Sequence, residues 1–123
     1  MSNYKNLIAW QKSHEMALCV YRISENFPKK EMFGLTSQIR RACLSVPTNI
    51  VEGYNRKRKK EFAHFLDIAL GSLAETQYLS KFAVAIGYMG NDDMRKIREL
   101  VDESGKLLWG LQKSQFPPSA LSL

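Results

Sequence analysis

The feature that most constrains the fold is a proline inside the amphipathic stretch of residues 34–54, GLTSQIRRACLSVPTNIVEGY. Polar residues recur along one seam at steps of three or four: Gln38, Arg41, Ser45, Asn49 and Glu52. This spacing places them on one side of a helix. Pro47 removes a backbone donor and disfavours helical geometry at Val46. We therefore predict a helix over residues 31–54 that is kinked or broken near Pro47.

Three further segments have helical patterns. Residues 6–26 carry an apolar stripe that ends at Phe27-Pro28, since a helix rarely continues into the residue before a proline. Residues 60–86 are apolar nearly all round, with Gly87 at the end, and the last helix starts with Asn91 as N-cap. No segment alternates with period two. We expect an all-α, antiparallel up-and-down four-helix bundle over residues 1–115, followed by a flexible tail over residues 116–123.

The apolar character of residues 60–86 has a second consequence. A four-helix monomer has no central helix, so a helix that is apolar on more than one side needs a cover from outside the chain. The pattern predicts that this helix forms a subunit interface in a homo-oligomer.

Composition excludes several classes of protein. Hydrophobic residues make up 45% and charged residues 24% of the chain, which is typical of a soluble globular domain. The longest apolar runs, MALCVY at 16–21 and FAVAI at 82–86, are too short to cross a membrane. The first residues lack the pattern of a secretory signal. Cys19 and Cys43 lack metal-ligand spacing, so we expect reduced core residues in a cytoplasmic protein.

Positive charge is concentrated in one quarter of the chain. Residues 29–60 hold nine basic and two acidic side chains, and the net charge of the whole chain is +6. Clustered cations favour polyanions, although a charge run can also be an ordinary solvated loop. We interpret six residues as candidates for non-specific RNA or DNA binding: Arg40, Arg56, Lys57, Arg58, Lys59 and Lys60. The alternative is a protein-interaction scaffold that recruits a protein partner and has no nucleic-acid role.

The polar row of residues 38–52 is interpreted as a structural network that fixes helix register, with a ligand contact as the alternative. Arg41 is expected to contact Glu75, because both lie among apolar helix positions. Ser45 and Asn49 are expected to satisfy backbone groups that Pro47 frees. The members of the predicted network are Gln38, Arg41, Ser45, Asn49, Glu52 and Glu75.

Catalysis has little support in the residues. His14 and His64 lie in different predicted helices, and the pair of His64 and Asp67 is too small to define a metal site. Gly71-Ser72 lies within a helix and lacks the strand-to-helix turn of a nucleophilic serine. We expect no enzyme activity, no cofactor and no metal.

One long motif resembles a known family. Its parts are FP at 27–28, GL at 34–35, SQI at 37–39, RA at 41–42, SVP at 45–47, NI at 49–50 and EG at 52–53, with matching residues in the first and third helices. These residues resemble the small bacterial four-helix bundle proteins encoded within intervening sequences of 23S ribosomal RNA genes. The resemblance covers nearly the whole chain up to Gln115.

The resemblance implies an up-and-down bundle that assembles as a ring of five. A related branch, the accessory protein of diversity-generating retroelements, binds nucleic acid and a reverse transcriptase. This chain departs from the family before the third helix, where Arg58-Lys59-Lys60 replaces a region that commonly carries an N-capping serine. The departure makes that loop more basic and the helix start less well specified.

Overall fold

The computed structural model describes residues 3–114, and all of its regular structure is helical. The elements are two short 3-10 helices, η1 (Tyr4–Asn6) and η2 (Lys29–Glu31), and four α-helices, α1 (Ile8–Ser24), α2 (Leu35–Tyr54), α3 (Lys59–Ala85) and α4 (Asn91–Ser114). The predicted four-helix bundle is confirmed. The expected tail over residues 116–123 lies outside the described residues.

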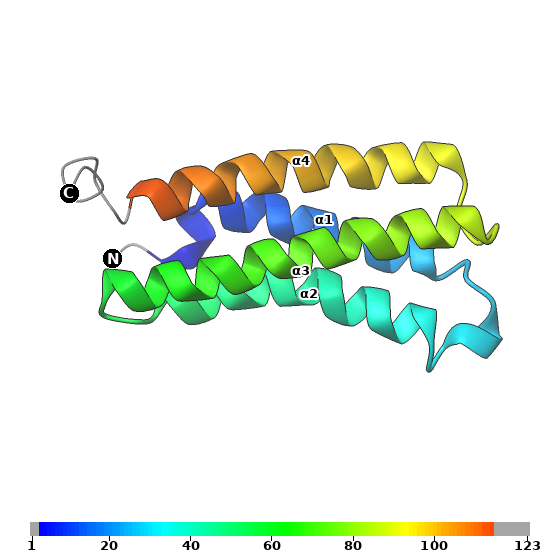
Figure 1. The fold of residues 1–123 in the computed structure, drawn as a ribbon, viewed down its shortest axis with the longest axis horizontal. Coiled ribbons are helices and arrows are strands. Elements are labelled where there is room, and N and C mark those ends of the chain that lie inside the picture. Colours follow the sequence, from blue (N-terminus) through cyan, green and yellow to red (C-terminus); the bar gives the residue numbers. More distant parts are fainter. Residues whose placement is uncertain (1–2, 115–123) are drawn as a thin grey trace.

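The four helices form one elongated bundle in which successive helices run in opposite directions (Figure 1). Each helix packs against two neighbours, in the cyclic order α1, α2, α3, α4. The hairpin between α2 and α3 lies at the same end as the start of α1 and the end of α4, and the other two connections lie at the opposite end (Figure 1). This arrangement separates the two ends of α2, which matters for the basic residues below.

The core runs along the bundle axis and takes side chains from every helix. Met16, Ile39, Leu66 and Ile97 come from α1, α2, α3 and α4, and none of them is exposed. Burying a side chain of this size stabilises a protein by about 1.5–3 kcal/mol. The core-facing positions of α2 and α4 follow the periodicity that the sequence predicts. In α1 the predicted stripe through Trp10, His14 and Tyr21 is wrong, because the buried face runs through Ala9, Ser13, Met16 and Val20 and leaves His14 and Tyr21 exposed.

Pro47 is buried inside α2, and the helix is assigned without interruption from Leu35 to Tyr54. The predicted break is therefore wrong, while a kink stays a prediction. Pro47 leaves the carbonyl of Cys43 without its helical donor. The Asn49 amide instead donates to the carbonyl of Ser45 at 2.8 Å, so the expected rescue of the freed group by Asn49 is also wrong.

The far end of the bundle is held together by Glu31. One carboxylate oxygen accepts from the backbone N–H of Leu35 at 3.1 Å, at the start of α2. The other accepts from the Tyr88 hydroxyl at 2.8 Å, from the turn between α3 and α4. Because Glu31 caps α2 from outside, the helix begins at Leu35 and not at residue 31 as predicted.

The turn between α3 and α4 needs a glycine. Gly87 has a φ of 86°, in the left-handed region that glycine adopts without strain, and it ends α3 as predicted. The carbonyl of Gly90 accepts from the N–H of Met94, so Gly90 occupies the N-cap and Asn91 is the first residue of α4. Within the described residues, no helix has the length and apolar character needed to cross a lipid bilayer.

Candidate nucleic-acid interface

Gly53 brings α2 and α3 close together at the hairpin that joins them. A Cβ atom at this position would lie 2.8 Å from both Cδ1 of Phe62 and Cβ of Phe65, so only glycine fits. The two helices therefore stay in contact up to the last turn of α2. The connection that follows is short, and all five residues from Arg56 to Lys60 are exposed.

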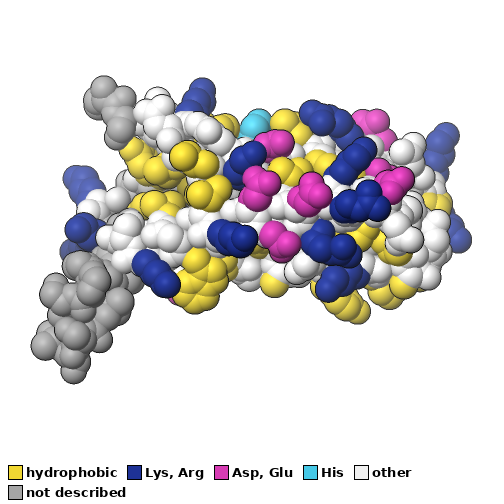
Figure 2. All heavy atoms as spheres, turned by 90° about the horizontal axis from the view of Figure 1, so that it is seen from above, with side chains coloured by type: hydrophobic (Ala, Val, Ile, Leu, Met, Phe, Trp, Pro, Cys, Tyr) yellow, Lys and Arg dark blue, Asp and Glu magenta, His cyan; other side chains and the backbone are white. Residues whose placement is uncertain are grey.

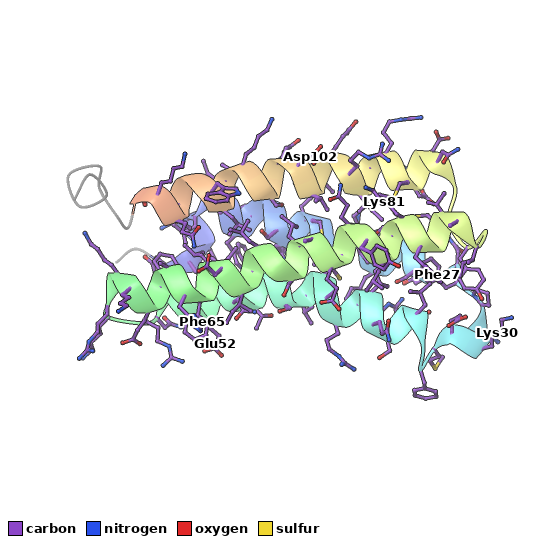
Figure 3. All side chains as sticks on the ribbon, in the orientation of Figure 1. Phe27, Lys30, Glu52, Phe65, Lys81 and Asp102 are labelled. Carbon is purple, nitrogen blue, oxygen red and sulfur yellow. The ribbon has the colours of Figure 1, made fainter. Side chains whose placement is uncertain are left out.

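Arg56 folds back across the hairpin onto α3. Its guanidinium carbon lies 4.9 Å from the centroid of the Phe65 ring, in cation–π geometry. Its Nη2 atom lies 3.6 Å from the Glu52 carboxylate, one turn earlier on α2. Figure 3 shows Glu52 and Phe65 close together at this end of the bundle. Arg56 is thus positioned by contacts from both helices.

The start of α3 is poorly stabilised. Arg58 occupies the N-cap and makes no capping hydrogen bond through its side chain, which agrees with the weak helix start expected from the sequence. Lys59 and Lys60 then place positive charge at the positive end of the helix dipole, where it is unfavourable. The Arg58 Nε atom lies 3.9 Å from Glu61, a loose exposed contact. A bound anion would offset these costs.

A hollow of about 520 Å³ lies on the outside of this hairpin. Its floor is the half-buried ring of Phe65, and the His64 ring stands edge-on to it with centroids 5.8 Å apart. The side chains and backbone that line the hollow belong to Arg56, Arg58, Lys60, Glu61, His64 and Phe65. The site therefore combines three cations, one carboxylate and two rings.

Sequence reasoning missed Phe65 as part of this site. The aromatic residues nearest to the basic run in the sequence are Tyr54 and Phe62, but these two rings pack on each other, edge to face, at 6.2 Å. The contact between Arg56 and Phe65 joins a residue of the connection to a residue of α3 nine positions later. No helical spacing signals such a pair, because it depends on how the hairpin closes.

Arg40 does not belong to the basic cluster. Whereas Arg56 follows the end of α2 at Tyr54, Arg40 lies inside the helix, roughly 21 Å along the axis from that end. Its guanidinium donates to the Ser24 hydroxyl at 2.8 Å and to the Tyr21 carbonyl at 3.1 Å, and it stacks over the Tyr21 ring at 4.7 Å. Arg40 thereby closes the carboxyl end of α1. These contacts are those of a helix cap, and the predicted role of Arg40 in nucleic-acid binding stays a prediction.

The predicted polar network is smaller than expected. Asn49 donates to the Ser45 hydroxyl at 2.9 Å, and Ser72 on α3 donates to the same hydroxyl at 2.9 Å. This chain joins α2 to α3, and Ser72 is a member that the sequence did not indicate. Glu52 instead pairs with Arg56 at the hairpin.

The expected contact between Arg41 and Glu75 is wrong. Both residues are exposed, as is Gln38, and neither charge forms an ion pair within residues 3–114. Arg41 lies one turn before Ser45 on α2 and Glu75 one turn after Ser72 on α3, so in these antiparallel helices both lie on the same side of the link between Ser45 and Ser72, across one seam. In water a charge needs no protein partner, so the energetic reason for pairing does not apply.

The outer surface of α2 and α3 is partly apolar. On α3, the spacing of Ile68 and Phe82 places them on one side of the helix, and 39% of Ile68 and 44% of Phe82 are exposed. On α2, 48% of Leu44 is exposed. Gly71 lies between the two α3 residues and faces open space. We call this surface the outer α2–α3 face; it comprises Arg41, Leu44, Ile68, Gly71, Glu75 and Phe82.

The cysteines and histidines sit in settings that suit packing. Burial raises the pKa of the Cys43 thiol to about 12, and it also raises the pKa of half-buried Cys19. His14 is stacked on Trp10 with centroids 4.8 Å apart. Asp67 accepts a hydrogen bond from Gln112 of α4. Across residues 3–114 there is no cluster of three or more His, Cys, Asp or Glu side chains suited to a metal.

This chain is similar to one described protein family and to solved structures. The family model described as 23S rRNA-intervening sequence protein matches residues 5–110. The chain is also similar to a solved structure of a protein of unknown function from the S23 ribosomal protein family of Bacteroides thetaiotaomicron VPI-5482. The two share 27% sequence identity with a TM-score of 0.77, over 86% of this chain and 99% of the other. No curated protein matches this chain.

Proposed function

This chain belongs to the 23S rRNA-intervening sequence protein family, and we propose that it is a non-enzymatic homo-oligomer that binds RNA or DNA through its α2–α3 hairpin. The observation that carries the proposal is the exposure of five consecutive cations at one end of the bundle. Lys57, Lys59 and Lys60 have no ion-pair partner within the described part of the chain. They are free to neutralise phosphates.

The face that carries α4 has no such excess of positive charge. Figure 2 shows the face over α4, where Lys and Arg side chains alternate with Asp and Glu. Residues 91–123 hold five basic and five acidic side chains, so that part of the chain has no excess charge. A polyanion is therefore drawn to the hairpin. The cations there are suited to phosphates and not to base edges, so we expect binding that tolerates any sequence.

A homo-oligomer would bind a polyanion more tightly than a single chain, because it carries several copies of the basic hairpin. The outer α2–α3 face offers apolar side chains together with the opposite charges of Arg41 and Glu75, which suits packing against another copy. The number five comes from the family resemblance. Several copies of the hairpin in one particle would bind one polyanion at many points. We place the protein in the cytoplasm, where its two free cysteines stay reduced.

The test replaces Arg56, Lys57, Arg58, Lys59 and Lys60 by serine and measures RNA and DNA affinity across a salt titration. For the wild type, the logarithm of affinity should fall with the logarithm of salt concentration, with a slope near −0.9 per phosphate contact on duplex DNA and about −0.7 on single strands. The variant should lose binding while its oligomer stays intact, because exposed charges add little stability. Equal affinity of the two proteins, or no binding at low salt by the wild type, contradicts the proposal.

A protein-interaction scaffold is the second candidate. It is favoured by Phe33, which lies in the connection between α1 and α2 with 95% of its surface exposed. A large exposed aromatic residue is a common anchor in protein interfaces. The family resemblance makes a reverse transcriptase one partner to test. In this case Phe33→Ser would abolish capture of the partner, and the serine variant of the hairpin would retain it.

A further inference from the structure

We propose that the hollow at the α2–α3 hairpin binds one unpaired base of a single-stranded nucleic acid, stacked on the platform that Arg56 and Phe65 form. This assignment rests on the proposed function and deepens it, because it names the form of nucleic acid that the hairpin prefers. It concerns Arg56, Arg58, Lys60, Glu61, His64 and Phe65, the residues that line the hollow.

The platform is built before any ligand arrives. Arg56 lies over the Phe65 ring at 4.9 Å, and the Glu52 carboxylate holds its guanidinium from the side at 3.6 Å. With 45% of its side chain exposed, Arg56 remains accessible while it contacts the ring. Planar guanidinium groups and aromatic rings are the two surfaces on which proteins stack bases. In this hairpin the Arg56 guanidinium lies over the Phe65 ring.

The cations around the platform are placed for the backbone of the same nucleotide. Arg58 and Lys60 line the hollow beside Phe65, and Glu61 is the one carboxylate among the lining residues. The contact between Arg58 and Glu61 is 3.9 Å long and exposed, so an incoming phosphate can displace it. A base on the platform therefore has positive charge beside its flanking phosphates.

This geometry discriminates between single strands and duplexes. In a duplex the face of each base is covered by its neighbours, so a protein reaches only the phosphates and the base edges. An unpaired base presents its face. The hollow of about 520 Å³ lies within the size range of small-molecule sites and is large enough for one base. The free cations outside it, Lys57 and Lys59, attract both forms alike.

The experiment compares the full-length wild type with Phe65→Leu and Arg56→Lys at low salt. The probes are a single strand of about 20 nucleotides, long enough to span one binding site, and the duplex of the same sequence. Both variants keep the charge of the hairpin but remove one layer of the platform. Each should weaken single-strand binding by roughly five- to a hundredfold, the range for losing one stacked base, and leave duplex binding within about twofold.

A fluorescent base in the single strand gives a second readout, because stacking on the platform quenches it and a merely structural role of Phe65 does not. Phe62→Leu is the matched control: it makes the same substitution one turn earlier, beside the same Gly53, at a ring that does not line the hollow. If Phe65→Leu fails to fold, Arg56→Lys decides the question.

The two possible failures are distinguishable. Wild-type protein that binds single strand and duplex equally, with neither variant changing the ratio or the quenching, overturns the stacking site and leaves binding by charge in place. Wild-type protein that binds neither probe overturns the proposed function and the stacking site together.

Discussion

At the scale of single residues, Gly53 determines how the hairpin closes. A Cβ atom at this position would lie only 2.8 Å from the Cβ atom of Phe65. The Cβ atom of Phe65 is attached directly to the α3 backbone, so it cannot move aside unless the helix moves. The contact brings Phe65 to the place where Arg56 folds over it. The basic tip and the ring beneath it therefore depend on one small residue in the preceding helix.

We expect Gly53→Ala to lower the free energy of unfolding by about 1–3 kcal/mol, because the added methyl group overpacks the contact between the helices. Urea unfolding at fixed protein concentration measures the change. Gly110→Ala is the control, since that position of α4 faces open space and alanine there should raise stability by about 1 kcal/mol through helix propensity. A Gly53→Ala protein as stable as the wild type would contradict the close approach.

At the scale of elements, Glu31 joins the connection between α1 and α2 to the turn between α3 and α4. The N–H of Leu35 lowers the pKa of the Glu31 carboxyl below its usual value, and the Tyr88 hydroxyl lowers it further. The same bond raises the pKa of Tyr88. Because the folded pKa of Glu31 lies below the unfolded value, its contribution to stability is present above the unfolded pKa, about 4.3. It is lost as the pH falls through the folded pKa.

Glu31→Gln should therefore lower the melting temperature at neutral pH, and the difference from the wild type should shrink as the pH falls from about 6 to about 3. Tyr88→Phe should lower it at neutral pH as well, because it removes the hydroxyl that bonds Glu31. Thermal unfolding followed by circular dichroism measures both. Glu25→Gln, an exposed carboxylate at the same end of the bundle, serves as the control. A difference between Glu31→Gln and the wild type that does not change with pH would rule out this cause.

At the scale of the whole molecule, the outer α2–α3 face has the character of an interface. One chain leaves Leu44 of α2 and Ile68 and Phe82 of α3 partly exposed, and Arg41 and Glu75 are exposed on the same two helices. The apolar side chains of α3 therefore lie in two places, the core of the bundle and this outer face. The exposed charges that do not pair within the chain suit pairing between copies.

We predict a homo-oligomer, most simply a ring of five chains of 14.1 kDa each. Ile68→Lys should dissociate it, because burying an unpaired charge in an apolar contact costs several kcal/mol. Ala74→Lys, on an exposed part of α3 away from the outer face, should leave assembly unchanged. Light scattering coupled to size exclusion gives the mass directly. A wild-type monomer of 14.1 kDa at micromolar concentration would refute the prediction.

The sequence by itself determined the helices of this protein and much of where they end. Pro28 and Gly87 are stop signals that act locally, and the apolar stripes that repeat every 3.6 residues select the faces that form the core. The cluster of positive charge at residues 56–60 could also be predicted from the sequence, because these residues are consecutive in the chain. These features depend on residues a few positions apart, so a linear pattern is enough to predict them.

Only the tertiary structure decided what the polar residues do. Arg40 inside α2 and Arg56 just beyond its end have the same side chain, yet one closes the end of α1 and the other covers Phe65. Arg41 and Glu75 lie across one seam but remain exposed to water. In contrast, Ser45 is hydrogen-bonded to Ser72, and Glu31 is hydrogen-bonded to Tyr88, 57 residues away. A polar side chain is stabilised by whichever partner the packed helices bring within about 3 Å. That partner is set by the packing of whole elements and not by the spacing of residues along the chain.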